Sequence, residues 1–111
     1  MRYLRILSIG ALLAGVIIDA PAHAQAPPTP ADPSATGAQL FASTCGFCHQ
    51  NGGRAPGRGP KLAGTERPDD FIANRIRLGK EGAMPAYGRA FTDAQIRSLV
   101  AYIRSLKDDS Q

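Results

Sequence analysis

The stretch Cys45-Gly46-Phe47-Cys48-His49 decides how this chain of 111 residues folds and what it carries. Two cysteines separated by two residues and followed at once by a histidine are typical of a covalent haem attachment site. Each thiol can add across one vinyl group of a porphyrin, and the imidazole of His49 can then bind the iron from one face. The motif therefore predicts one covalently bound haem, because the sequence contains no second pentapeptide of this kind.

The residues at the N-terminus indicate export. Arg2 and Arg5 precede an apolar stretch of 13 residues, from Ile6 to Ile18, and Ala22-His23-Ala24 supplies small residues for a signal peptidase. We predict a signal peptide over residues 1–24 and a periplasmic location for the mature chain. The apolar stretch is shorter than the ~20 residues that span a bilayer. We therefore expect no membrane span after cleavage, with a retained anchor as the alternative.

The composition of the remaining chain predicts a short leader and one domain. Cleavage leaves 11 basic and 8 acidic residues, a net charge of +3. Proteins that bind nucleic acid usually show a denser basic stripe, so we expect no nucleic-acid partner. Residues 25–35 contain four prolines and no large apolar side chain, which predicts a disordered leader. The domain is then expected over residues 36–111.

Two helices are predicted on either side of the motif. Thr36 and Gln39 form a capping box that opens a helix running into the cysteines. Pro68 suits the first position of a second helix, and Gly79 can end it. The expected apolar face of this second helix consists of Phe71, Ile72 and Ile76.

The last predicted helix has the strongest periodic signal in the chain. Thr92 and Gln95 form a second capping box at its start. Apolar residues then recur at helical spacing, at Ile96, Leu99, Val100, Ile103 and Leu106. No segment alternates as a strand would, so the predicted fold class is all-α.

Met84 is the predicted sixth ligand of the iron. A methionine in a loop more often fills a gap in the core, so the position alone does not decide its role. A thioether nevertheless suits haem iron opposite histidine. After cleavage, His49 and Met84 are the only histidine and methionine of the chain. Lys61 and Lys80 could bind iron only when deprotonated, which is costly near neutral pH.

In their order and spacing these residues resemble the small class I cytochromes c of bacteria. The positions that match are Gly37, Leu40, Phe41, the haem motif, Gly59-Pro60-Lys61-Leu62, Met84-Pro85 and Tyr102-Ile103. The resemblance implies a compact fold of about three main helices around one haem c, with the first and last helices crossing near Gly37 and Tyr102. It also implies that the backbone carbonyl of Pro60 accepts the second ring N–H of His49, which would orient the imidazole on the iron.

Two filled axial sites predict a one-electron carrier and not an enzyme. Such a carrier would pass electrons from a dehydrogenase or respiratory donor to a downstream acceptor through transient docking. It would be a monomer or the cytochrome subunit of a dehydrogenase. Arg54, Arg58 and Lys61 could form a basic rim that attracts acidic redox partners, or simply a solvated loop.

Two other uses of the motif remain as alternatives. Haem catalysis or gas sensing requires an open sixth iron site and distal groups, and the mature chain offers no distal histidine. A thiol–disulfide protein would place the cysteine pair at a strand-to-helix turn. The absence of any predicted strand makes that second use the weaker of the two.

Overall fold

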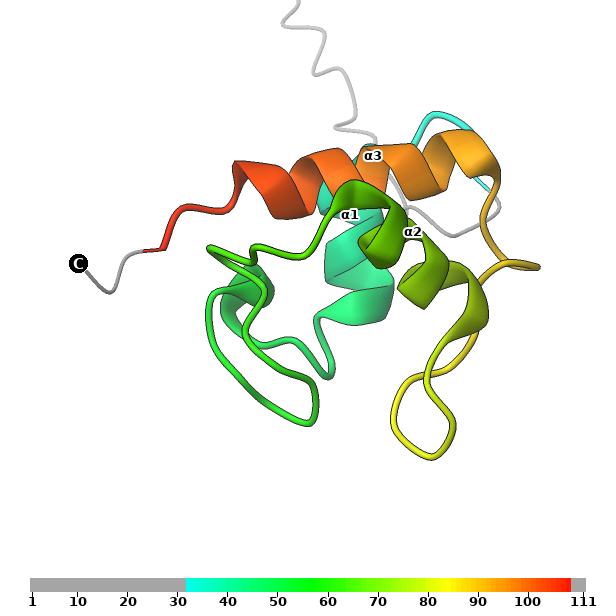
Figure 1. The fold of residues 1–111 in the computed structure, drawn as a ribbon. Coiled ribbons are helices and arrows are strands. Elements are labelled where there is room, and N and C mark those ends of the chain that lie inside the picture. The colour runs from blue at the N-terminus through cyan, green and yellow to red at the C-terminus, as the bar shows by residue number, and fades with distance from the viewer. Residues whose placement is uncertain (1–31, 109–111) are drawn as a thin grey trace, which may run out of the picture.

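The structure is a computed structural model that describes residues 32–108. The predicted signal peptide and residues 25–31 of the predicted leader lie outside the described residues. Three α-helices follow one another in the chain, α1 (Gly37–Leu40), α2 (Asp69–Leu78) and α3 (Asp93–Ser105). Between residues 32 and 108 there is no strand, only an isolated bridge between Lys80 and Met84. The all-α prediction is therefore confirmed (Figure 1).

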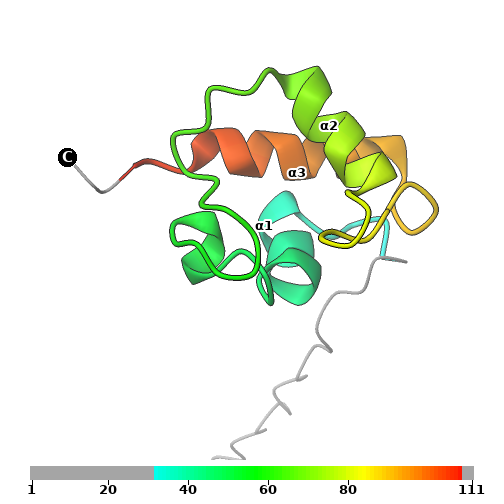
Figure 2. The same cartoon turned by 60° about the horizontal axis from the view of Figure 1, so that its bottom comes forward.

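α1 begins at the predicted capping box and continues as a wider helix. The Thr36 hydroxyl accepts the Gln39 N–H, and the Gln39 side chain accepts the Thr36 N–H at 2.9 Å. A π-helical segment, Phe41–Cys45, then carries the chain to the haem motif. This wider turn is a common feature of functional sites, because it shifts the direction of the following residues. Both α1 and α2 pack against α3, which they flank in the view of Figure 2.

The close approach of α1 to α3 depends on Gly37. A Cβ atom on this residue would lie 2.6 Å from the carbonyl carbon of Ser98, closer than non-bonded atoms can approach. The contact is with Ser98, one helical turn before Tyr102, so the crossing lies near the two residues that the resemblance implied. Tyr102 also contacts the first helical segment, because its ring lies 5.0 Å from that of Phe41, and its hydroxyl donates to the Gly52 carbonyl at 2.9 Å.

α2 differs from its prediction at two positions. Pro68 is the N-cap residue with extended backbone, and the helix begins at Asp69, one residue later than predicted. Gly79 ends the helix at φ 66°, as expected. Ile72 is buried against the core, whereas Phe71 is 39 % exposed and lies outside the core cluster, although it lines the cavity together with Ile72 and Ile76. The centroid of the Phe71 ring lies 5.0 Å from the guanidinium carbon of Arg67 and 5.2 Å from that of Arg75.

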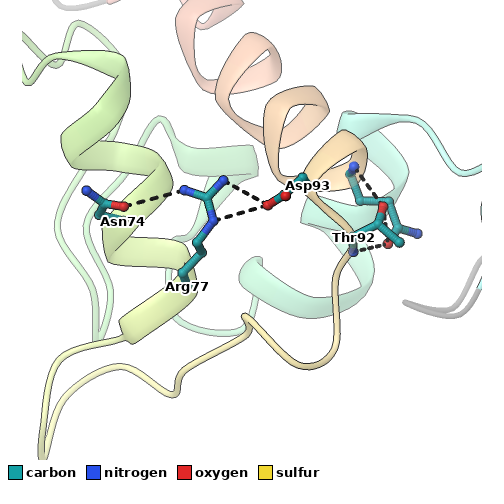
Figure 3. Close-up of polar contacts among 5 residues, drawn as sticks. Asn74, Arg77, Thr92 and Asp93 are labelled. Atoms are coloured by element: carbon teal, nitrogen blue, oxygen red, sulfur yellow. Dashed lines mark hydrogen bonds and ion pairs between the residues drawn. The ribbon is translucent and has the colours of Figure 1, made fainter.

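α3 begins at the second capping box, as predicted. The Gln95 side chain accepts the Thr92 N–H at 2.9 Å, and Arg77 of α2 joins Asp93 in the first turn of α3 at 2.9 Å (Figure 3). The helix ends at Ser105, so Leu106 lies just beyond its last turn although its side chain is buried. The four other apolar residues predicted for this face are buried in the core, namely Ile96, Leu99, Val100 and Ile103.

Packing extends four residues further toward the N-terminus than the predicted domain boundary. Ala35 belongs to the core cluster, and the Asp32 carbonyl accepts a hydrogen bond from the Gln95 side chain at 2.9 Å. Residues 32–35 of the predicted leader are therefore attached to the start of α3. None of the helices between residues 32 and 108 is long and apolar enough to span a membrane.

Candidate haem site

A cavity of about 580 Å³ lies beside the pentapeptide motif. Its wall brings together Cys45, Cys48 and His49 from the segment after α1 and Met84 from the loop after α2. Much of the remaining wall is apolar, with isoleucines contributed by α2 and α3. The four residues predicted from sequence to attach the cofactor and bind its iron thus line one cavity, although Met84 lies 35 positions after His49 in the sequence.

His49 is held by its neighbours in a single orientation. Its Nδ1 atom lies 2.8 Å from the Pro60 carbonyl oxygen, so the Pro60 contact predicted from the resemblance is present. Because a carbonyl can only accept, Nδ1 carries the proton, and Nε2 is left as the electron-pair donor. Nε2 makes no hydrogen bond to any residue between 32 and 108. Gly59 lies against the ring, and a Cβ there would approach Nδ1 to 2.7 Å.

The two cysteines carry free thiols at the edge of the cavity. The amide groups of Cys48 and His49 both donate to the Cys45 carbonyl, at 3.1 and 3.0 Å, in a tight turn that gathers the motif. Burial raises the pKa of the Cys45 thiol to about 11, and the charge of Cys48 acts in the same direction. Two thiols and an imidazole around an apolar cavity fit a covalently attached haem. Among residues 32–108, no three His, Cys, Asp or Glu side chains are arranged so that they could hold a metal ion by themselves.

Backbone hydrogen bonds position Met84. The amides of Lys80 and Met84 each donate to the other residue's carbonyl at 2.8 Å, which closes a short loop between them. Gly79 permits this loop to return, because a Cβ there would lie 2.7 Å from the Pro85 carbonyl. The Met84 side chain is half-buried and touches the core while it lines the cavity. Met84 is therefore placed to act as a ligand in the cavity, and it also packs against the hydrophobic core.

Tyr87 lines the same cavity, and sequence reasoning assigned it no role. Its ring lies 5.5 Å from that of Phe91, and its amide donates to the Ile76 carbonyl at 2.9 Å. Burial raises the pKa of the Tyr87 hydroxyl, and negative charge on Cys45 and Cys48 would raise it further. No periodic pattern surrounds Tyr87 in the loop, so only the fold could identify it.

The charged residues that line the cavity are all basic. They are Arg58, Lys61, Arg67, Arg75 and Lys80, and no Asp or Glu of the described chain contributes to the wall. Two members of the predicted basic rim, Arg58 and Lys61, are among them, whereas Arg54 is not. Lys61 is paired with Asp108, so the positive charge of the wall is partly compensated on that side.

Comparison with known proteins identifies the family. Residues 32–103 match the family model described as cytochrome c oxidase, cbb3-type, subunit III. The chain belongs to the class I cytochrome c family. Cytochrome c6 of Picosynechococcus sp. is 33% identical to this cytochrome over 91 residues, covering 70% of this chain and 77% of that protein.

Two solved structures are similar to this cytochrome in sequence and fold. Cytochrome c6C from Synechococcus sp. PCC 7002 is 32% identical with a TM-score of 0.52, covering 65% of this chain and 94% of that one. A chain of p-cresol methylhydroxylase with substrate bound is 32% identical with a TM-score of 0.54, covering 65% and 93%.

Family membership settles the cofactor and the broad activity. This cytochrome carries covalently bound haem c with its iron, and it acts in electron transfer with redox protein partners. When bound, the haem supplies a one-electron exchange between ferric and ferrous iron. The cavity described above is where the chain offers an apolar wall, two thiols and an oriented imidazole for it.

Proposed function

We propose that this cytochrome is a periplasmic one-electron carrier in which Cys45 and Cys48 attach the haem and His49 and Met84 bind its iron. One observation carries the proposal: these four side chains line a single cavity, with the imidazole already fixed by Pro60. A site closed on both faces leaves no iron position for a substrate. Electron exchange is then the activity that the arrangement supports best.

Each residue of the site has a distinct role in this proposal. The two cysteines would tether the cofactor as thioethers. The carbonyl of Pro60 would hold the His49 tautomer with Nε2 toward the iron and strengthen its donation. The thioether of Met84 would favour the ferrous form and raise the reduction potential.

The cationic wall supports docking with an acidic redox protein. Arg58, Arg67 and Lys80 contribute positive charge to a wall to which no carboxylate of residues 32–108 contributes. Charge complementarity of this kind mainly accelerates encounter and weakens as ionic strength rises, which suits a transient contact. The donor would be a dehydrogenase or a respiratory complex. Similarity to a chain of p-cresol methylhydroxylase favours an oxidising enzyme as the partner, with this chain as its electron-accepting subunit.

An optical measurement on the exported protein tests the proposal. Produced in a host that attaches haem c, the protein should be low-spin in both oxidation states. Its ferric form should show the weak red-region band of sulfur bound to iron. The mass should equal residues 25–111 plus one haem, which would also establish cleavage after Ala24.

Substitution of the methionine sharpens the same test. Met84→Ala should abolish the red-region band and allow carbon monoxide to bind the ferrous protein. Leu78→Ala is the matched control, because it shortens an apolar side chain close to Met84 in the sequence that is 78 % exposed and does not line the cavity. Ready binding of carbon monoxide by the unaltered protein would contradict the closed site and favour sensing or catalysis instead.

A further inference from the structure

Arg75 presents a positive charge to the cavity that no carboxylate of the described chain neutralises. The residue lies in α2, is half-buried and forms part of the cavity wall. Two other arginines of the domain are paired with carboxylates: Arg77 contacts Asp93 at 2.9 Å and Arg104 contacts Asp69 at 2.6 Å. Among residues 32–108, Arg75 forms no ion pair. Arg75 therefore differs from Arg77, two residues further along the helix: Arg75 lines the cavity and has no carboxylate partner among the described residues, whereas Arg77 does not line the cavity and is paired with Asp93.

Two contacts fix the position of the Arg75 guanidinium. Nη1 donates to the Gly79 carbonyl at 3.3 Å, at the end of the same helix. The central carbon of the guanidinium lies 5.2 Å from the centroid of the Phe71 ring, a distance at which a cation is attracted to an aromatic face. A guanidinium held from two sides is a fixed charge, unlike a lysine ammonium on a flexible stem.

The surroundings of Arg75 strengthen the electrostatic effect of its charge inside the cavity. The neighbouring wall contains the apolar side chains of Ile72 and Ile76, and no acidic residue of the described chain lies along it. Charges act over longer range in such a setting than in water, because the effective dielectric constant is lower.

We propose that Arg75 is a determinant of the reduction potential of this cytochrome, an inference that rests on the electron-carrier function proposed above. Uptake of one electron from a redox protein converts ferric to ferrous iron and reduces the positive charge of the site by one. No bond forms or breaks, and the electron later passes to an acceptor protein. A fixed cation beside the site favours the state with less positive charge, so Arg75 raises the potential.

Three substitutions separate the charge of Arg75 from its other contacts. Arg75→Gln removes the charge, Arg75→Lys keeps it while losing the planar fork, and Arg77→Gln removes a charge that Asp93 already compensates. The reduction equilibrium of the Arg75→Gln protein should shift about tenfold toward the oxidised form, which is ~59 mV for a one-electron couple. The shift for Arg75→Lys should be less than half of that, and Arg77→Gln should cause little change.

Redox titration of the haem-loaded variants at one fixed ionic strength measures these shifts. The red-region sulfur band is recorded for each variant, because its persistence shows that iron ligation is unchanged. The inference is overturned if Arg75→Gln shifts the potential no more than Arg77→Gln does, or if Arg75→Lys shifts it as far as Arg75→Gln. It is also overturned if Arg75→Gln loses the band, since the residue would then act through Met84.

Failure of this inference can be told apart from failure of the proposed function. A closed, sulfur-bound site in the unaltered protein with an unmoved potential in Arg75→Gln contradicts the inference alone. An open sixth site in the unaltered protein contradicts the carrier function, whatever the variants show.

Discussion

At His49, one backbone carbonyl and one glycine determine how the imidazole is held. The Pro60 carbonyl accepts from Nδ1 at 2.8 Å, and Gly59 leaves room for the ring beside the backbone. Both residues belong to the loop that follows the motif and come from no regular element. The hydrogen bond selects the tautomer, and the missing side chain permits the approach that the hydrogen bond requires.

Gly59→Ala should therefore disturb the histidine without touching the motif itself. A Cβ at this position would lie 2.7 Å from Nδ1 and 2.8 Å from Nε2, so the ring must move away from Pro60. We expect a loss of about 1–3 kcal/mol in the free energy of unfolding, typical of overpacking, together with an altered ferric spectrum. Thermal unfolding and optical spectra of the haem-loaded protein measure both effects.

Gly82→Ala is the control for this substitution. Gly82 has φ 70°, so alanine there costs backbone strain of about 1–2 kcal/mol, but nothing lies within 4 Å of the added atom. Its ferric spectrum should stay unchanged. Unchanged spectra in both variants would show that Gly59 does not constrain the histidine.

The Cys45 thiol gives the haem-free chain a stability that falls with rising pH. Burial raises its pKa to about 11 from 9.0, so between these values the folded chain binds more protons than the unfolded one. The stabilising contribution is thus complete below pH 9 and lost as pH rises through 11. A thioether does not titrate, so the haem-loaded protein should not show this loss.

Urea unfolding at pH 8, 9, 10 and 11 checks this expectation, with an osmolyte added to favour the folded haem-free chain. Haem-free Cys45→Ser protein is the reference, because other groups titrate equally in both chains. The idea fails if the two haem-free proteins lose stability in parallel across this range.

At the scale of elements, the crossing of α1 over α3 rests on one missing side chain. Gly37→Ala would place a Cβ 2.6 Å from the carbonyl carbon of Ser98, and a helix backbone cannot yield locally. The helices must move apart, and we expect about 3 kcal/mol of destabilisation, at the upper end for overpacking. Ala38→Ser, on the exposed side of α1, should cost roughly 0.5 kcal/mol. Urea unfolding of both haem-loaded variants compares them, and equal midpoints would refute the tight crossing.

The start of each helix could be predicted because its signals are local. Both capping boxes close within four residues, so Thr36 and Thr92 identify helix starts without knowledge of the fold. Pro68 was misplaced by one position because a proline suits both the N-cap and the first helical turn. Periodicity placed Phe71 on the same face as Ile72 and Ile76, and all three line the cavity, but the partial exposure of Phe71 beside two guanidinium groups could not be predicted.

The residues of the candidate site also fall into two groups: those that a local sequence motif or the residue inventory predicts, and those that depend on the fold. The motif and the residue inventory were enough to predict Cys45, Cys48, His49 and Met84 as the residues that would meet the cofactor, and the fold brings them to one cavity. Their binding of haem and iron remains a prediction. The roles of Tyr87 and Arg75 could not be predicted, because both depend on a cavity that distant segments of the chain form together. Gly59 matched the resemblance, but its close approach to the His49 ring is visible only in the structure.

The molecule as a whole has a small core beside a large cavity. Its largest fully buried side chains are Phe41, Leu40, Ile96 and Leu99, and the cavity of about 580 Å³ separates parts of α2 from the motif. Domains of this size usually need a covalent or cofactor-based support for stability. Because both cysteines are free thiols near the cavity, the chain has no disulfide among the described residues to provide it.

Loss of the cofactor should therefore destabilise the entire domain. In the Cys45→Ser/Cys48→Ser double variant, we expect a loss of about 3 kcal/mol or more, which lowers the melting temperature by roughly 12–24 °C for a domain of this size. Differential scanning calorimetry of the double variant and the haem-loaded protein measures the difference. Ala42→Ser, an exposed change in the same segment, is the control. Equal melting temperatures for the double variant and the haem-loaded protein would mean that the polypeptide is stable alone.

The two reciprocal helix caps also bear on biosynthesis. Each involves only residues within four positions of one another, so neither depends on the cofactor or on distant segments. A newly made chain can thus define where its first and last helices begin while the cysteines are still accessible to the machinery that joins them to haem. We expect long-range contacts such as Gly37 against Ser98 to become stable only afterwards. Maturation would then proceed in three steps: the helix starts form, the cysteines are joined to haem, and α1 packs against α3. Hydrogen exchange on the haem-free chain should show protection first at the amides that the caps bond, those of Thr36, Gln39, Leu40, Thr92, Gln95 and Ile96. Absence of protection at these amides would contradict this order.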